Sequence, residues 1–424
     1  MRELILLAIV AALSVTALFR PRIGLYGYVW FAVMRPDVLA WSSGSYPYSL
    51  VLAIATLAGS IRYFGNAASF LRNPIVRQLL VLQIPLALSV LFAVNSSIAI
   101  DPFLFYLRMV VMSLLIPLLI ETGDQLATLL LVIAVSMGVL ASKFGLFGLV
   151  SGGVRFSGGY GGLLSDNNSM ALAFVMGMAL CWHLRPTLKS RWLRMAMLGM
   201  VVLAMAGAIM TYSRGAALSL AAVLLFTAFT SRHRLATLVL MASLCFPAFY
   251  LVRESYVDRL STMKSGEAGG NRLDNYRAAI AMWLDHPIFG VGYGKENQQR
   301  LLSRYTDRDE ETEIVIHDTY LQMLVDSGIF ALVVYLLLLF GTIFRMGRLA
   351  RRTRESHPAT ASRARAIQTA LIAFAVGGTF LSRIDFDLTY MLCLCAATLL
   401  EVDPGESVDD IAAERETSLS CVSA

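Results

Sequence analysis

One histidine of the chain occupies a position that would suit a general acid or base. His317 is one of five histidines, and it lies where a polar stretch, 253–316, gives way to a hydrophobic segment, with Asp318 beside it. An imidazole titrates near neutral pH and can act as the general base that takes a proton from a hydroxyl group. Alternatively, His317 is an ordinary residue at the start of a helix, and its side chain only forms hydrogen bonds with the backbone.

Arg214 is the second candidate, in Thr-Tyr-Ser-Arg214-Gly between two long apolar runs. A membrane arginine in such a place usually has a functional or structural partner. Its planar fork suits bidentate binding of phosphate. The alternative is a side chain that extends to the membrane interface.

Arg272 is the third candidate, at the start of a predicted amphipathic helix that ends at Pro287. The N-terminus of a helix also favours anions. The alternative, a solvated helix end, is the commoner situation for a single arginine. The apolar face of this helix is predicted to consist of Leu273, Ala279, Ile280, Trp283 and Leu284.

Three weaker signals accompany these residues. Asp166 and Asn168 end a glycine-rich loop before an apolar run, and their polar side chains could line a sugar site. The segment 290–294 is glycine-rich, but it lacks the dinucleotide spacing and is predicted to be a turn. Asp385-Phe-Asp stands next to Arg383, and ion pairing with that arginine is favoured over metal binding.

Composition defines the elements that must position these residues. The chain has 424 residues, of which 57% are hydrophobic and 15% charged, whereas soluble proteins carry roughly 25% charged residues. This indicates an all-α, polytopic helical membrane protein with about twelve transmembrane helices, since apolar runs of ~20 residues recur along the chain. The net charge of +6 does not imply nucleic acid, because the positive residues lie in short loops. The candidate spans are 4–19, 23–36, 47–62, 77–94, 103–120, 125–142, 167–184, 194–212, 214–231, 235–252, 317–344, 366–381 and 385–401.

The distribution of arginines predicts the orientation. Segment 345–365 holds seven arginines and one acidic residue, and further positive residues crowd 185–194 and 232–234. These loops should be cytoplasmic. Alternation then places 253–316 on the other side of the membrane.

The predicted organisation has four parts. They are an N-terminal transmembrane region (1–252), an extracytoplasmic loop domain (253–316), C-terminal transmembrane helices (317–401) and a disordered, acidic cytoplasmic tail (402–424). Thirteen spans with a cytoplasmic C-terminus would put the N-terminus outside. Since the first two apolar segments are short and joined only by Phe19-Arg-Pro-Arg22, either the N-terminus is outside or one segment does not span, and twelve full spans are favoured.

Several of these residues together resemble one family. Ser213-Arg214-Gly, Arg272 fifteen residues before Pro287, and His317 ahead of Tyr320-Leu resemble the O-antigen ligase and polymerase superfamily. The N-terminal Arg20-Pro-Arg-Ile-Gly-Leu-Tyr through Met34-Arg-Pro-Asp resembles the subgroup of exosortase-associated O-glycosylation ligases. The resemblance extends over most of residues 20–400.

The resemblance implies a metal-independent, GT-C-type glycosyltransferase of the Gram-negative inner membrane with a large helical periplasmic loop and no cofactor. Such a ligase moves a polysaccharide from undecaprenyl pyrophosphate to a sugar hydroxyl of lipid A–core, with inversion. Carried over by motif, Arg214 and Arg272 would bind the donor pyrophosphate and His317 would activate the acceptor hydroxyl. Further substrate contacts are expected from Tyr212, Tyr276, Asp166, Asn168 and Arg383.

Other acceptors and one other class of protein remain open. A polymerase would extend the same polysaccharide, and a protein O-glycosylation ligase would transfer it to serine or threonine. A transporter is disfavoured, because the candidate charges gather on one predicted face and no repeated halves are evident.

Overall fold

The computed structural model describes residues 2–39, 47–66, 70–152, 166–231, 233–246, 250, 267–302, 304–305 and 316–402. The predicted tail beyond 402 and part of the predicted 253–316 domain lie outside the described residues.

All the regular elements of the described residues are helices, which confirms the all-α prediction. A helix occupies each of the predicted spans. The elements are α1 (Arg2–Phe19), α2 (Pro21–Met34), α3 (Pro36–Leu39), α4 (Tyr48–Ser60), η1 (Ile61–Asn66), α6 (Pro74–Leu91), α7 (Ser96–Leu119), α8 (Gly123–Val150), α9 (Asn167–Leu184), η3 (Arg185–Thr187), α10 (Arg191–Ile209), α11 (Arg214–Thr230), Arg234–Phe246, α13 (Glu267–Asp285), α14 (Lys295–Leu302), α15 (Thr319–Arg352), α16 (Pro358–Gly377), η4 (Gly378–Phe380) and α17 (Asp387–Val402).

Seven helices of the described chain are long and apolar enough to cross a membrane, which makes this a multi-pass membrane protein. Large apolar side chains such as Trp192 and Phe344 are about 70% exposed, as expected of surfaces that face lipid rather than water. α1 and α2 are separate helices that turn at Arg20. With 14 residues, α2 reaches only about 21 Å, which is shorter than the ~30 Å hydrocarbon core.

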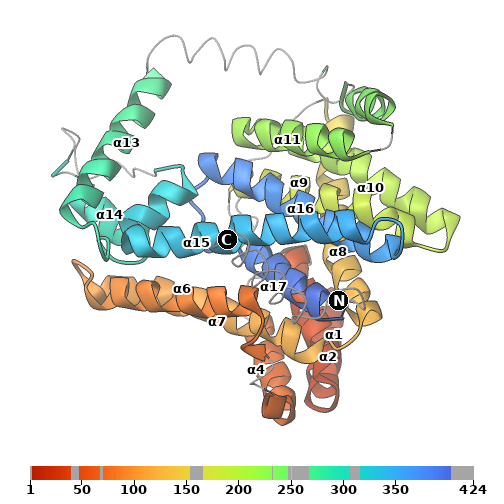
Figure 1. Cartoon of the computed structure of the whole chain (residues 1–424), viewed down its shortest axis with the longest axis horizontal. Coiled ribbons are helices and arrows are strands. Elements are labelled where there is room, and N and C mark those ends of the chain that lie inside the picture. Colours follow the sequence, from red (N-terminus) through yellow and green to blue (C-terminus); the bar gives the residue numbers. More distant parts are fainter. Residues whose placement is uncertain are drawn as a thin grey trace, which may run out of the picture.

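Two helices form the centre of the bundle. Nearly every residue of α9 and α17 is buried, and a helix that is apolar all round needs neighbours on every side. α9 packs against α8, α10, α11 and α16, and α17 packs against α6, α7, α15 and α16. α6, α7 and α15 run along the long axis of the molecule, and α13 and α14 gather at one end of it (Figure 1).

The glycine-rich segment 290–294 forms a turn that connects α13 and α14 to the helix bundle. α15 is interrupted at Gly328, whose φ of 77° is in the left-handed region. The backbone N–H of Val291 donates to the carbonyl of Val325 at 2.8 Å, and Ile329 donates to the carbonyl of Pro287 at 3.1 Å. A Cβ at Gly328 would collide with the carbonyl of Ile288. The segment predicted to be a turn therefore supplies the backbone partners that the broken helix lacks.

The predicted helix over α13 exists, but its predicted apolar face is largely wrong. Leu273, Ile280 and Leu284 are each at least 45% exposed. Of the predicted face, Ala279 is buried, and it belongs with Met282, Val291, Leu301, Ile316 and Val325 to a small core next to α15. Ala278 is buried as well. Small residues let the two helices approach closely, so packing against α15 decided which face was buried.

Candidate functional site

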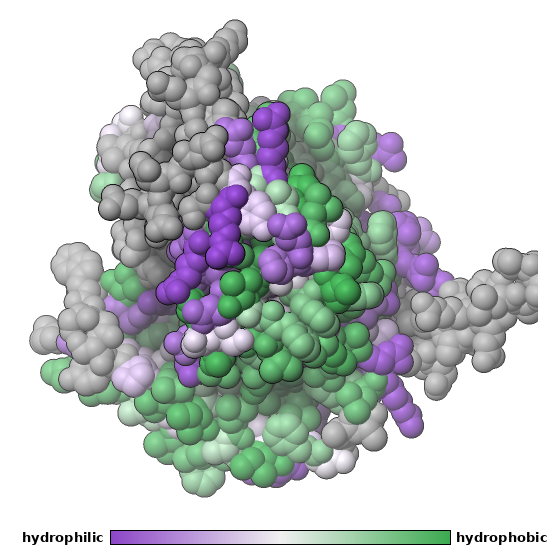
Figure 2. Space-filling model, turned by 90° about the vertical axis from the view of Figure 1, so that its left-hand side faces the viewer, coloured by the Kyte–Doolittle hydropathy of each residue, from purple (hydrophilic) through white to green (hydrophobic). Residues whose placement is uncertain are grey.

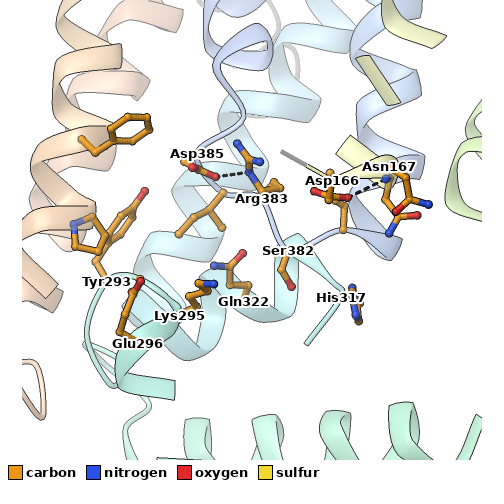
Figure 3. A pocket seen from close by; sticks show the side chains of 16 residues that line it. Asp166, Asn167, Tyr293, Lys295, Glu296, His317, Gln322, Ser382, Arg383 and Asp385 are labelled. Atoms are coloured by element: carbon orange, nitrogen blue, oxygen red, sulfur yellow. Dashed lines mark hydrogen bonds and ion pairs between the residues drawn. The ribbon is translucent and has the colours of Figure 1, made fainter. Parts of the chain in front are cut away.

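A pocket of about 720 Å³ opens between the start of α15, the loop before α17, the start of α9 and the turn before α14. Its size is within the range of ligand pockets. Polar side chains from all four segments surround the same hollow (Figure 3). It is lined by Pro102, Phe105, Asp166, Asn167, Asn168, Tyr293, Gly294, Lys295, Glu296, His317, Gln322, Leu381, Ser382, Arg383, Ile384 and Asp385.

His317 lines this pocket from a strained backbone. Its φ is 54°, in the left-handed region that side chains other than glycine seldom adopt. Ile316 on one side is buried in the core beneath α13. On the other side Asp318 caps α15, accepting hydrogen bonds from the backbone N–H groups of Tyr320 at 2.8 Å and Leu321 at 2.9 Å. Ile316 and the Asp318 cap hold the backbone of His317 in a conformation that costs energy. Residues with such a strained backbone cluster at functional sites.

Asp318 is thus a capping residue. Burial raises the pKa of its carboxyl group, and the two backbone N–H donors oppose that shift. Its side chain accepts hydrogen bonds from the first turn of α15 and so fixes the direction in which the chain enters that helix.

Arg383 reaches the same pocket from the loop before α17. The hydroxyl of Thr319 donates to the carbonyl of Leu381 and accepts from the backbone N–H of Arg383 at 3.3 Å, which ties this loop to the start of α15. The guanidinium forms the predicted ion pair with Asp385, at 2.8 Å. Burial opposes the charge of Arg383, but the carboxylates of Asp385, Asp387 and Asp166 outweigh it and raise the pKa, so the side chain stays cationic.

The start of α9 supplies a third wall. Asp166 accepts hydrogen bonds from the backbone N–H groups of Asn168 at 2.8 Å and Ser169 at 3.0 Å. Asn167 donates to the carbonyl of Thr211 at 3.2 Å and so links this wall to the turn before α11. Asp166 and Asn168, both predicted at a sugar site, lie in the pocket with His317 and Arg383.

Arg214 and Tyr212 do not line the pocket, although they lie close to its wall. Arg214 is the first residue of α11, and Ser213 caps that helix. A Cβ on the next residue, Gly215, would touch Phe380, one residue before the pocket-lining Leu381. Tyr212 is 5% exposed and has a φ of 55°. Among the described residues other than glycine, a positive φ occurs at two of the predicted site residues, Tyr212 and His317.

Of the remaining two candidates, the structure places one outside the pocket and does not describe the side chain of the other. Tyr276 packs at the edge of the small core beneath α13. The backbone of Arg272 is in α13, and its side chain lies outside the described residues.

Sequence reasoning missed the polar residues on the α14 side of the pocket. They are Tyr293, Lys295, Glu296 and Gln322, together with Ser382 from the loop before α17 (Figure 3). The only signal in the sequence was the glycine-rich segment 290–294, which contains Tyr293 and precedes Lys295 and Glu296, and it indicated a turn but not what the turn faces.

Four of these polar groups are buried and make no hydrogen bond within the described part of the chain. They are the hydroxyls of Tyr293 and Ser382 and one oxygen each of Glu296 and Gln322. Gln322 donates its amide to Asp326 at 3.2 Å, which leaves its oxygen free for a ligand. Buried polar atoms are normally paired, so four unpaired ones around one hollow indicate a polar ligand.

Burial also raises the pKa of the Tyr293 hydroxyl well above its ordinary value, and the carboxylate of Asp385 adds to the shift. Tyr293 therefore stays protonated and can donate a hydrogen bond to such a ligand.

The arrangement combines an imidazole, a guanidinium and hydrogen-bonding groups in one pocket. Seen from the end that carries α13 and α14, hydrophilic side chains gather in the middle of the face and hydrophobic side chains cover the area beneath them (Figure 2). α9, α15 and α17 all begin at this pocket, and helix N-termini favour negative charge. Such a site can activate a hydroxyl and stabilise an anionic leaving group.

Comparison with known families agrees with this geometry. Residues 199–336 match the model of the O-antigen ligase family, and this stretch contains Arg214, α13, α14, His317 and the first half of α15. Residues 1–181 match a family of unknown function, DUF5935. No curated protein matches the chain. The match over 199–336 confirms the predicted resemblance to the O-antigen ligase superfamily, and it supports glycosyl transfer of the O-antigen ligase or polymerase type in general.

Proposed function

We propose that this protein is an O-antigen ligase that transfers polysaccharide from undecaprenyl pyrophosphate to a sugar hydroxyl of lipid A–core. The observation that carries the proposal is the pocket that joins His317 and Arg383 to four buried, unpaired polar groups. The proposed location is the inner membrane, with this pocket on the periplasmic side, because the arginine-rich loop 345–365 lies at the other end of α15.

In the proposed reaction His317 takes the proton of the acceptor hydroxyl. The oxygen attacks the anomeric carbon of the donor and forms the new glycosidic bond. The bond from that carbon to the pyrophosphate oxygen breaks, and the leaving pyrophosphate keeps the electron pair. Attack from the face opposite the leaving group inverts the anomeric centre.

Cationic side chains would stabilise the charge that builds on the leaving oxygen. Arg214 and Arg272 are the proposed donor ligands by their family motifs. Arg383 is a third arginine, and its place in the pocket supports a role in the same task. A fixed guanidinium in a site walled by apolar side chains costs no reorganisation at the moment of reaction.

The remaining polar groups would hold the sugars. Asp166, Asn168, Gln322 and Ser382 offer hydrogen-bond donors and acceptors on different sides of the pocket, and sugar hydroxyls need both. Tyr212 and Tyr276, which lie outside the pocket, remain proposed contacts to the longer parts of the substrates.

Reconstitution with defined substrates tests the proposal. Purified protein in liposomes would receive a prenyl-linked polysaccharide together with rough lipopolysaccharide, and the products would be separated on a gel. We expect a ladder on lipid A–core that is lost in the His317→Ala, Arg214→Ala and Arg272→Ala variants. Longer prenyl-linked chains would instead identify a polymerase, and transfer to an added periplasmic protein would identify a protein ligase. If all three variants kept full activity, the assignment of these residues would be wrong.

A further inference from the structure

The first pocket is called the proposed glycan site below. A second pocket, of about 270 Å³, lies at the opposite ends of α9 and α15. The last turns of α9, α11 and α15 meet the first turn of α16 here, whereas α9 and α15 begin at the first pocket. It is lined by Trp182, His183, Thr227, Thr230, Ser231, Thr237, Ala350, Arg354, Pro358, Ala361, Ser362 and Arg365.

The charge of this pocket is positive. Two arginines line it, Arg354 and Arg365, and its lining contains no acidic residue. Arg365 donates to the side-chain oxygen of Gln368 at 2.7 Å and lies over the ring of Phe226, 5.6 Å from the ring centre. Neither contact carries a compensating negative charge. A guanidinium held beside other arginines in a concave site favours an anion.

The backbone of α16 adds to this preference. The helix begins at Pro358, and its N-cap residue, His357, makes no side-chain hydrogen bond to the first turn. Pro358, Ala361 and Ser362 of that first turn line the pocket. The positive end of a 20-residue helix therefore faces the same space as the two arginines.

Hydroxyl groups complete the lining. Thr227 is 3% exposed, and the hydroxyls of Ser231 and Thr237 lie 2.8 Å apart. Hydroxyls can donate to phosphate oxygens. His183 is held by a 3.1 Å contact between its Nε2 and the hydroxyl of Thr369, which fixes this wall of the pocket.

The side chains around the pocket are of the kinds that gather at membrane interfaces. Trp182 lines it, and Arg185 stacks over the Trp182 ring at 4.4 Å, as in the aromatic belts at membrane interfaces. Beside the pocket, Phe229 is 66% and Leu235 75% exposed. These apolar side chains offer a surface for acyl chains, whereas the pocket itself has room for a headgroup.

We propose that this pocket binds the phosphate headgroup of an anionic phospholipid, between the ends of α9, α11 and α15 and the start of α16. The bound lipid joins four helices, of which α9 and α15 begin at the proposed glycan site. The assignment is independent of the donor and acceptor proposed above.

Native mass spectrometry of the full chain in detergent tests this proposal. Phosphatidylglycerol, phosphatidylcholine and inorganic phosphate would be titrated separately. We expect one tightly retained phosphatidylglycerol, weaker binding of phosphatidylcholine, and no competition from inorganic phosphate at equal concentration. The Arg354→Gln/Arg365→Gln variant should bind phosphatidylglycerol about tenfold more weakly or worse, because arginines near anionic lipid each contribute to binding.

Arg194→Gln is the matched control, because Arg194 is an exposed arginine near the same end of the molecule that does not line the pocket. It should bind phosphatidylglycerol as the unchanged chain does. If the double variant fails to fold, Ser362→Glu keeps both arginines and brings a carboxylate into the pocket, and it should weaken binding similarly. Equal lipid retention in the pocket variants and the control would overturn the proposal. If inorganic phosphate competed at equal concentration, the ligand would be a soluble anion and not a lipid, and the proposal would be overturned as well.

Discussion

The left-handed backbone of His317 is the most distinctive feature of the proposed glycan site. A non-glycine residue in that region costs of order 1–3 kcal/mol, and at His317 the core beneath α13 and the cap of α15 hold it there. The sequence identified the imidazole and its neighbour Asp318, but only the structure shows that Asp318 is the cap that orients the histidine.

Replacing His317 by asparagine should separate chemistry from folding. Asparagine tolerates the left-handed region better than most residues, so the fold should persist while the base is lost. We expect glycan transfer to fall about 10²–10⁴-fold, the usual contribution of a general base, measured as initial rates in liposomes.

His286→Ala is the control, since His286 follows α13 but does not line the pocket. It should transfer glycan at the unchanged rate. A His317→Asn protein with normal turnover would exclude His317 as the base.

The sequence predicted Arg383 as an ion-pair partner and as a substrate contact. The ion pair with Asp385 is present in the structure. Arg383→Ala should slow transfer on the order of 100-fold, the effect of removing one strong electrostatic contact. Arg383→Lys should recover only part of this, because an ammonium cannot make the bidentate contact of a guanidinium. The rates would be compared at saturating acceptor with varied donor. An Arg383→Lys protein with the unchanged rate would argue that Arg383 only completes the ion pair.

At the scale of elements, the break in α15 joins the glycine-rich turn to the bundle. The sequence showed both the glycine-rich segment and the long hydrophobic segment. It could not show that they meet, because each backbone partner lies more than 30 residues away along the chain, as Val291 and Val325 do. The same contact decided which face of α13 was buried.

Gly328→Ala should disturb this junction. A Cβ there would meet the backbone of Ile288, and the positive φ disfavours any side chain. We expect a loss of about 1–3 kcal/mol in stability, together with faster proteolysis between α13 and α14 and reduced transfer. Thermal unfolding and limited chymotrypsin digestion in detergent would measure it, because Phe289 and Tyr293 lie between the two helices.

Gly199→Ala in α10 is the matched control, because no heavy atom lies within 4 Å of a Cβ at that glycine. It should leave stability unchanged or raise it slightly. If both alanine variants unfolded alike, the junction would have no special role.

At the scale of the whole molecule, the two pockets lie at opposite ends of α9 and α15. The predicted orientation makes the glycan site extracytoplasmic. In a cysteine-free background, Arg300→Cys in α14 should react with a membrane-impermeant maleimide added to cells with a permeabilised outer membrane. Arg191→Cys at the start of α10 should react only after the inner membrane is opened. Both residues are exposed. The reverse pattern would place the pocket in the cytoplasm and end the ligase proposal.

The sequence by itself determined the helices, the membrane class, the family and the chemical types of the site residues. These follow from local properties, namely the length of apolar runs, the helix caps and short motifs. The tertiary structure alone decided which of those residues share a pocket. It brought Asp166, His317 and Arg383 together with Tyr293 and Gln322, left Arg214 beside the wall, and put Tyr276 into a small core. The reason is that a pocket is made where helix ends from distant parts of the chain pack together, and the close contacts that set this packing, such as those at Gly215 and Gly328, carry no local pattern.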